Sequence, residues 1–301
     1  MENEGINFES LEAQRKKVNK KNIIFYLIGG LLIVLAVVLF FFEDFSFLAI
    51  IAIIPALLLF VAATINKKRF TDSLKGNLIA ELIKEELGED AVYNINGGID
   101  LNEINSLRVA SYPDRYHFED HICAKYNDIP YEMCDCVFEE KVVTRDSKGN
   151  VRVSYKTYFK GRIIKIDFKR DLDVTMKIVN EGTQGFTAES LQKFETEVIE
   201  FNKKFKTYVS DSEKGFYILT PHMISKMQEL ERMFTGGMTF VFKNGIFYTL
   251  INNYKSSLEV DVSKKFDEEQ IKRIRSEILL GASIINEFRL DKDKYNTNYE
   301  N

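Results

Sequence analysis

Two long apolar runs lie near the start of the chain. Residues 23–42 and residues 45–65 contain no charged side chain. As helices rising about 1.5 Å per residue, each would reach about 30 Å, the thickness of the hydrocarbon core of a bilayer. Neither run has the polar face of a helix that packs on a soluble core, and the 22 residues before the first run argue against a cleavable signal peptide. The pattern predicts a transmembrane helical hairpin over residues 23–65, after an N-terminal segment 1–22.

Charges around the two runs predict the direction of this hairpin. Only Glu43 and Asp44 separate the runs, and basic residues flank them on the outer sides. Because Lys and Arg are enriched on the cytoplasmic side of membrane spans, both termini are expected in the cytoplasm, with Glu43 and Asp44 outside. The lipid bilayer of the cell membrane is therefore a predicted partner, and Gly29 and Gly30 are expected to let the two helices approach closely. The flanking basic residues are Arg15, Lys16, Lys17, Lys20, Lys21, Lys67, Lys68 and Arg69.

Residues 66–90 have the pattern of a juxtamembrane helix. Phe70, Leu74, Leu78 and Leu82 recur every four residues, and Gly88 stands where a helix C-cap is expected. This helix either continues the second span as a stalk or breaks near residues 71–73.

The first part of residues 91–290 is rich in strand patterns. Tyr131–Thr144 and Val151–Phe159 flank a polar turn, which predicts a β-hairpin. Arg162–Phe168 and Asp173–Val179 are two further expected strands.

Helices and strand pairs alternate from Thr187 onward. Thr187 is expected to cap a helix that runs to Phe205, and residues 206–210 and 216–219 are expected to be strands about a turn at 211–215. Strand pairs joined by short turns imply antiparallel pairing, so the sequence predicts an α+β cytoplasmic domain over residues 91–290 and a polar tail over 291–301. The remaining expected elements are a helix opened by Thr220 and Pro221, a hairpin about Asn244-Gly245, and a long last helix after Asp267 with the stripe Ile271, Ile274, Ile278, Ala282, Ile285 and Phe288.

Composition narrows the class of protein. The chain is 45% hydrophobic and 29% charged, which is typical of a folded protein. Its 41 basic and 45 acidic residues give a net charge of −4, so nucleic acid is not an expected partner. Three Cys are too few for a disulfide-stapled secreted domain.

Four segments stand out after the predicted hairpin: Glu119-Asp120, Phe159-Lys160-Gly161, residues 200–211 and residues 217–223. Together with the hairpin, they resemble the bacterial DUF3137 family, whose function is unknown. The resemblance implies no catalytic or binding residue, and it implies a LemA-type membrane protein as a possible partner. Asp211 lies in the shared segment, where it either closes a turn or belongs to a functional site.

The richest cluster of reactive side chains lies between His117 and Cys136. In an extended chain His117, Glu119, His121 and Cys123 share one face, and in a helix His117 and His121 share one. Either geometry could present two imidazoles to Zn²⁺, with Cys134 or Cys136 from a neighbouring strand. Their spacing matches no standard zinc motif, and Cys in a strand is usually a small buried hydrophobic residue. The sequence therefore predicts no cofactor, and a metal site built from His117, His121, Cys134 and Cys136 is the alternative.

No catalytic motif stands out along the chain. It has no G-x-S-x-G, H-E-x-x-H, G-x-G-x-x-G or Walker A sequence. The preferred interpretation is a bacterial, membrane-anchored, non-enzymatic interaction or binding module. The alternative is a membrane-tethered enzyme or metal-binding domain that uses the His117–Cys136 region.

Overall fold

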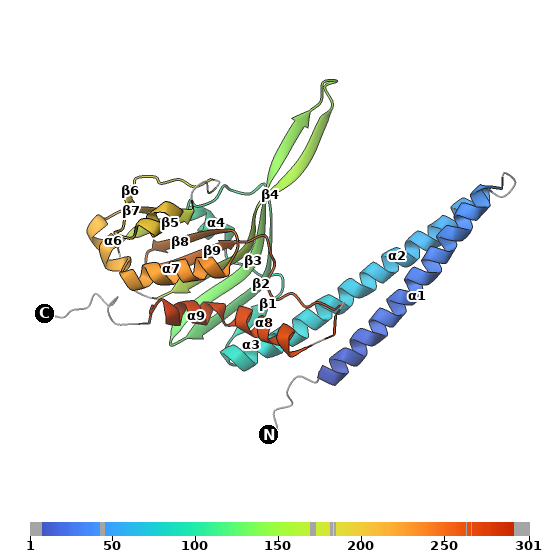
Figure 1. Cartoon of the computed structure of the whole chain (residues 1–301), viewed down its shortest axis with the longest axis horizontal. Coiled ribbons are helices and arrows are strands. Elements are labelled where there is room, and N and C mark those ends of the chain that lie inside the picture. Colours follow the sequence, from blue (N-terminus) through green and yellow to red (C-terminus); the bar gives the residue numbers. More distant parts are fainter. Residues whose placement is uncertain are drawn as a thin grey trace. The chain divides into compact units, whose positions relative to one another are not determined.

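A computed structural model describes residues 8–42, 46–168, 173–180, 183, 185–262, 264–265 and 267–291. The chain is divided into two compact units. The first contains residues 1–82 and 259–274, and the second contains residues 83–258 and 275–301. The described helices are α1 Phe8–Phe40, α2 Ser46–Leu74, a π-helical turn Lys75–Ile79, α3 Ala80–Leu87, α4 Leu101–Ser106, α5 Ile199–Lys204, α6 Ser212–Ile218, α7 Pro221–Met233, α8 Glu268–Ile278 and α9 Leu280–Glu287 (Figure 1).

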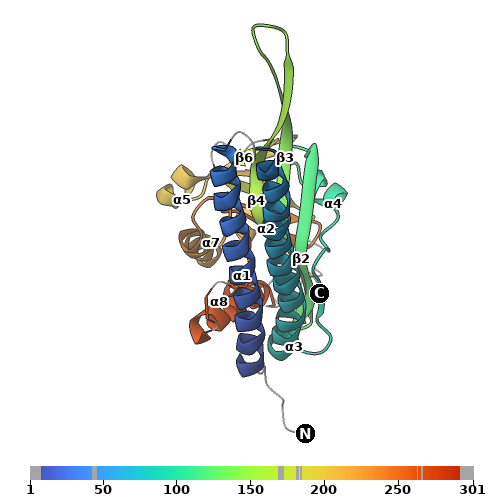
Figure 2. The same cartoon turned by 90° about the vertical axis from the view of Figure 1, so that its right-hand side faces the viewer.

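Helices α1 and α2 lie side by side (Figure 2). Their contact is made by small residues, because Ala49, Ala56 and Ala63, seven residues apart on α2, are almost fully buried. A Cβ added to Gly29 would lie 3.1 Å from the Phe60 ring, which confirms the predicted close approach there, whereas Gly30 has nothing within 4 Å. By length and composition, both helices could cross a membrane.

The chain after α2 stays helical through residue 87. The π-helical turn Lys75–Ile79 interrupts the regular pattern, and α3 follows directly. Gly88 ends the helix with a φ of 93°, and its N–H donates to the Lys84 carbonyl at 3.0 Å. Of the two alternatives for this segment, the structure has the continuous helix, and the predicted C-cap at Gly88 is confirmed.

A single antiparallel sheet of nine strands dominates the second unit. The strand order is β1-β2-β3-β4-β9-β8-β5-β7-β6, and every neighbouring pair is antiparallel, so the predicted α+β class is confirmed. The bounds are β1 Val92–Asn94, β2 Arg115–Tyr126, β3 Ile129–Arg145, β4 Val151–Asp167, β5 Thr175–Asn180, β6 Gln192–Phe194, β7 Phe205–Val209, β8 Gly237–Lys243 and β9 Ile246–Asn252.

Apolar side chains are buried on both faces of this sheet. On one face, rings including Phe205, Phe240, Phe247 and Phe288 contact one another, and α9 packs on β2, β3 and β4. On the other face, the segment from Ile99 to Val109, which contains α4, covers a core cluster that includes Cys134, Cys136, Phe138, Ile163 and Leu250. The segment with α4 thus covers one face and α9 covers the other, so that the strands can bury apolar side chains on both faces.

The ends of β3 and β4 extend beyond the sheet as a two-stranded projection (Figures 1 and 2). We call residues 139–157 the β3–β4 arm. The predicted hairpin is confirmed here, and Asp146 closes its turn by accepting hydrogen bonds from the backbone N–H groups of Lys148 and Asn150, each at 2.9 Å. The strand expected separately at Arg162–Phe168 belongs instead to β4, which runs on from the arm into the sheet.

Two predictions after Thr187 are wrong. The helix expected from Thr187 to Phe205 is replaced by the short strand β6, by α5 and by the start of β7. The residues expected as a strand at 216–219 lie mainly in α6, which Asp211 caps. In the first place the pairing of β6 with β7 overrides the apolar spacing. In the second a local helix cap does so, because the carboxylate of Asp211 accepts from the N–H groups of Glu213 and Lys214.

The last helices follow the predicted stripe with one interruption. Asp267 accepts from the Gln270 N–H at 2.8 Å and so caps the helix, as expected. Leu279 separates α8 from α9, so the expected single long helix is two. All six predicted stripe residues are nevertheless buried. The Thr220 cap of α7 and the Asn244-Gly245 hairpin turn are also confirmed, the latter with φ angles of 53° and 73°.

Candidate functional site

A line of polar side chains crosses one face of the sheet. Cys123 on β2 is paired with Glu132 on β3, Glu132 with Lys165 on β4, and Lys165 with Tyr248 on β9. Residues paired across antiparallel strands project from the same face. The four side chains therefore form a row perpendicular to the strands.

A β-bulge adds His121 to this row. Asp120 has a φ of 57°, and the pairing of β2 with β3 shifts between Glu119 and Ile122. A bulge inserts one residue, so it reverses which side chains face each side of the sheet. The Asp120 carboxylate accepts a hydrogen bond from the Tyr93 hydroxyl at 2.5 Å, and the backbone N–H of Asp120 donates to the Ile95 carbonyl at 2.9 Å. These two hydrogen bonds hold the bulge in place.

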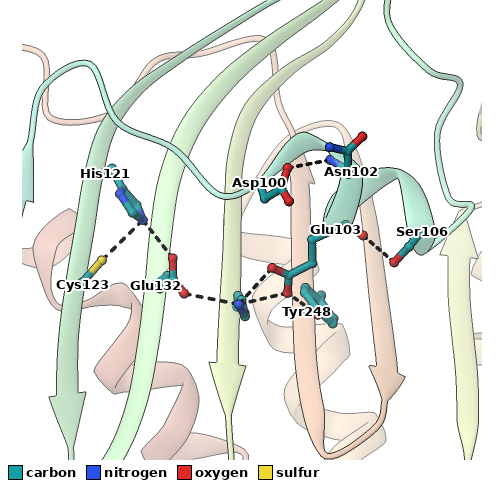
Figure 3. Close-up of polar contacts among 9 residues, drawn as sticks. Asp100, Asn102, Glu103, Ser106, His121, Cys123, Glu132 and Tyr248 are labelled. Carbon is teal, nitrogen blue, oxygen red and sulfur yellow. Dashed lines mark hydrogen bonds and ion pairs between the residues drawn. The ribbon is translucent and has the colours of Figure 1, made fainter.

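Three possible ligand atoms meet at the imidazole of His121 (Figure 3). Its Nε2 atom lies 3.1 Å from Oε2 of Glu132 and 3.4 Å from Sγ of Cys123. All three donor atoms lie within 4.8 Å of one another, and each residue is partly exposed. We call His121, Cys123 and Glu132 the His121 cluster.

The other half of the row is an ion-pair network. Lys165 Nζ lies 3.3 Å from Oε1 of Glu132 and 2.9 Å from Oε1 of Glu103 on α4. The Tyr248 hydroxyl donates to Glu103 at 2.7 Å. Asp100 caps α4 by accepting from the Asn102 N–H at 2.9 Å, and this fixes the helix that carries Glu103 (Figure 3). Lys165 thus holds the Glu132 oxygen that does not face His121.

The environment changes the proton affinities within the site. The hydrogen bond from His121 and the charge of Lys165 lower the pKa of Glu132, although burial opposes them. Burial, and then the charge of Glu132, raise the pKa of Cys123. Burial of Lys165 is outweighed by its hydrogen bonds to Glu103 and Glu132, so its pKa is raised. Glu132 therefore stays ionised at neutral pH, and Cys123 is a thiol when no cation is near.

The residues singled out from the sequence do not all meet here. His121 belongs to the cluster, whereas His117 lies before the bulge, with Nε2 4.0 Å from Glu119 Oε2 and most of its side chain exposed. Cys134 and Cys136 lie in the core, and burial raises the pKa of Cys134 to about 12 and that of Cys136 well above its ordinary value. The expected common face of His117, Glu119, His121 and Cys123 is wrong, because the bulge at Asp120 separates the first two from the last two.

Asp211 lies far along the chain from this row, at the start of α6. Its Oδ1 atom accepts from the Glu213 N–H at 2.9 Å and from the Lys214 N–H at 3.2 Å. These are the contacts of a helix N-cap. The structure therefore gives this residue of the DUF3137-like segment an architectural contact.

The geometry of the His121 cluster bears on its chemistry. A nucleophilic Cys–His pair oriented by a carboxylate uses the two ring nitrogens of His for the two partners. Here Cys123 and Glu132 both lie against Nε2, and the pKa of Cys123 is raised rather than lowered. Donor atoms that converge on one point suit a shared cation better than a proton relay.

Sequence reasoning found His121 and noted Cys123, but it missed Glu132, Lys165, Glu103 and Tyr248. These four come from β3, β4, α4 and β9, and only the strand register brings them together. Acidic and basic residues are frequent in this chain, so no local motif marks them.

The fold defines an α+β protein with two apolar N-terminal helices. Residues 157–290 match the model of the family DUF3137, which is described as a protein of unknown function. The match includes Lys165 and Tyr248, whereas the His121 cluster precedes it. No curated protein matches the sequence.

One solved structure has a distant similarity to the chain. It is the crystal structure of the mycobacterial trehalose monomycolate transport factor A, TtfA, with a TM-score of 0.36 and 8% sequence identity. The similarity covers 68% of this chain and 94% of that chain.

Proposed function

We propose that this protein is anchored in the cell membrane by α1 and α2 and that its α+β domain acts in the cytoplasm by binding rather than by catalysis. The observation that carries this proposal is the surface of the two helices. Leu31, Phe40 and Ile50 are 70%, 71% and 65% exposed, and similar side chains surround them. An apolar surface of this extent is stable in lipid and unfavourable in water.

The flanking charges support the direction of insertion. Eight basic residues, within 15–21 and 67–69, flank the two apolar runs on their outer sides, and none lies between the runs. Glu43 and Asp44, expected on the far side of the membrane, lie outside the described residues. A LemA-type membrane protein, implied by the family resemblance, is part of this proposal as a candidate partner of the domain.

The topology gives a direct prediction. A reporter that is active only in the cytoplasm, fused after Asn301, is expected to be active, and a reporter that is active only outside the membrane is expected to be silent there. The measurement is the ratio of the two activities in the native membrane. Insertion of the same pair between Glu43 and Asp44 is the matched control and should give the opposite ratio. An externally active fusion after Asn301 would contradict the proposal.

A second candidate function is the binding of a transition-metal ion by the His121 cluster. Zinc bonds of about 2.0 Å to N and O and about 2.3 Å to S, at tetrahedral angles, separate N from O by about 3.3 Å and N from S by about 3.5 Å. The observed separations are 3.1 Å and 3.4 Å. The two separations from His121 Nε2 are therefore close to those expected of ligands around one ion, and Glu132 Oε2 and Cys123 Sγ lie within 4.8 Å of each other.

Charge balance supports the same candidate. Glu132, Glu103 and a Cys123 thiolate carry three negative charges, and Lys165 carries one positive charge. A divalent cation makes this group neutral, which favours the ion in a partly buried place. Imidazole and thiolate ligands favour Zn²⁺ over Mg²⁺ or Ca²⁺. Lys165 would orient Glu132 through its second oxygen, as residues behind a metal ligand commonly do.

Cobalt provides the test of this site. We expect Co²⁺, added to the full-length protein in detergent at pH 8, to give thiolate-to-cobalt charge-transfer absorption with one equivalent bound. Cys123→Ser should abolish that band, and His121→Ala should weaken binding at least tenfold. Binding should strengthen up to about tenfold per pH unit below the raised pKa of Cys123, because the thiol must lose its proton.

His117→Ala is the matched control, because His117 lies on the same strand outside the cluster. It should leave the cobalt spectrum unchanged. Absence of a charge-transfer band, or a band that survives Cys123→Ser, would contradict the metal site without affecting the membrane anchoring.

A further inference from the structure

Beyond Glu139, the β3–β4 arm is a two-stranded element that pairs with no other strand in the described part of the chain. β3 pairs with β2 only as far as Glu139, and β4 pairs with β9 only from Gly161 onward. An isolated pair of strands is only marginally stable in water. Its exposed faces therefore call for an explanation beyond the folding of the sheet.

One face of the arm, which we call its apolar face, carries three valines and a tyrosine together with Lys141 and Arg145. The register pairs Val143 with Val153 and Arg145 with Val151, and Tyr155 with Lys141, so these side chains share a face. Val143, Val151 and Val153 are 53%, 55% and 48% exposed. The opposite face carries mainly polar residues: Glu140, Val142, Thr144, Arg152, Ser154 and Lys156.

The arm is strongly basic within an acidic chain. Residues 141–156 contain five basic residues and one acidic residue, whereas the whole chain has a net charge of −4. Lys156 pairs with Glu140 at 3.5 Å. Four cations make no ion pair with any residue that the structure describes: Lys141, Arg145, Lys148 and Arg152. Arg145, Lys148 and Arg152 lie in or beside the turn that ends the arm, and Lys141 lies near its base.

The base of the apolar face is fixed in place. The Arg115 guanidinium lies 4.3 Å from the centre of the Tyr155 ring and pairs with Glu139. Thr157 also donates to Glu139, at 3.3 Å. Tyr155 is therefore held beside the valines with its ring half exposed.

We propose that the β3–β4 arm docks on the anionic surface of a lipid bilayer, with Val143, Val151, Val153 and Tyr155 in the interface and the basic residues at the headgroups. Basic residues near an anionic leaflet attract it, and Tyr is favoured at the boundary between headgroups and acyl chains. A second copy of the arm would bring like charges together, which opposes self-pairing through this face. The proposal rests on the membrane anchoring for the nearness of the bilayer, since tethering raises the local concentration of lipid.

The absence of Trp from the sequence makes a sharp test possible. Val153→Trp places a single tryptophan on the apolar face, in the full-length protein reconstituted in nanodiscs. We expect its emission to shift to the blue, and to be quenched by brominated lipid, in discs that contain anionic lipid but not in purely zwitterionic discs. Raising the salt concentration should reverse the shift.

The matched control is Ser154→Trp, which places the tryptophan on the opposite face and should keep red-shifted, unquenched emission. Adding Lys141→Gln and Arg145→Gln to Val153→Trp should lower the equilibrium constant for docking about 30-fold, because each cation contributes a factor of about five to that constant. A nanodisc exposes both bilayer faces, so the result does not depend on the topology of the anchor. Equal emission of Val153→Trp in anionic and zwitterionic discs would overturn the proposal. An emission shift that depends only on protein concentration would also overturn it, because such a shift would indicate that the arm contacts a second copy of the chain.

Discussion

Phe205→Ala is expected to lower the free energy of unfolding of the α+β unit by about 3–5 kcal/mol, a large part of the roughly 5–15 kcal/mol typical of a domain. The Phe205 side chain is 1% exposed. Its ring lies 5.0 Å from that of Phe201 and 5.9 Å from that of Phe240, so truncation leaves a cavity between α5 and the sheet. The measurement is the thermal unfolding of the full chain in detergent, followed by circular dichroism.

Asp211→Ala in the same segment provides the contrast. It removes the acceptor for two N–H groups at the start of α6, and such a cap contributes about 0.5–2 kcal/mol. The melting temperature should therefore fall much less than for Phe205→Ala. A thermally silent Phe205→Ala would show that the aromatic core is wrongly assigned. An Asp211→Ala protein with unchanged stability and a lost cellular phenotype would assign Asp211 to a functional site.

A second large effect is expected at a buried ion pair. Arg162→Met should destabilise the α+β unit by about 3–5 kcal/mol, because it leaves the carboxylate of Asp135 uncompensated in the interior. Each side chain of this pair is 3% exposed, and Arg162 Nε donates to Asp135 Oδ1 at 2.8 Å. Arg162 also donates to the Glu277 carbonyl at 2.9 Å and so connects β4 to α8.

A double-mutant cycle separates the charge from the loss of packing. Asp135→Leu combined with Arg162→Met removes both charges, so the double variant should be more stable than the sum of the two single losses predicts, by about 0.5–3 kcal/mol. Urea unfolding of the four proteins in one detergent gives the coupling. Additive losses would mean that the two side chains do not depend on each other.

Local sequence signals predicted the elements whose ends are set by neighbouring residues. The apolar runs of α1 and α2, the cap at Thr220 and the turn at Asn244-Gly245 all depend on contacts within a few residues, and all are present. The segment from Thr187 to Phe205 has helical spacing as well. There the pairing of β6 with β7 decides the structure, and β7 lies beyond the segment that the pattern describes.

Less of the candidate site could be predicted from the sequence, again because contacts between distant segments decide its structure. The shared face of His117 and His121 follows from regular alternation, and one positive φ angle at Asp120 reverses it. Glu103 and Lys165 are 62 residues apart and meet only because α4 crosses the row. No periodicity in the sequence encodes a bulge or a crossing of this kind.

The strand order also has a consequence for the synthesis of the chain. β4 borders β9 in the finished sheet, yet Ile246, the first residue of β9, is 79 residues after Asp167, the last residue of β4. At a translation rate of about 5–20 residues per second, a nascent chain waits roughly 4–16 s before that strand leaves the peptidyl transferase centre. Throughout this interval the isoleucine-rich end of β4 lacks the strand that covers its hydrogen-bonding edge in the finished sheet, which leaves that edge open to pairing with other chains.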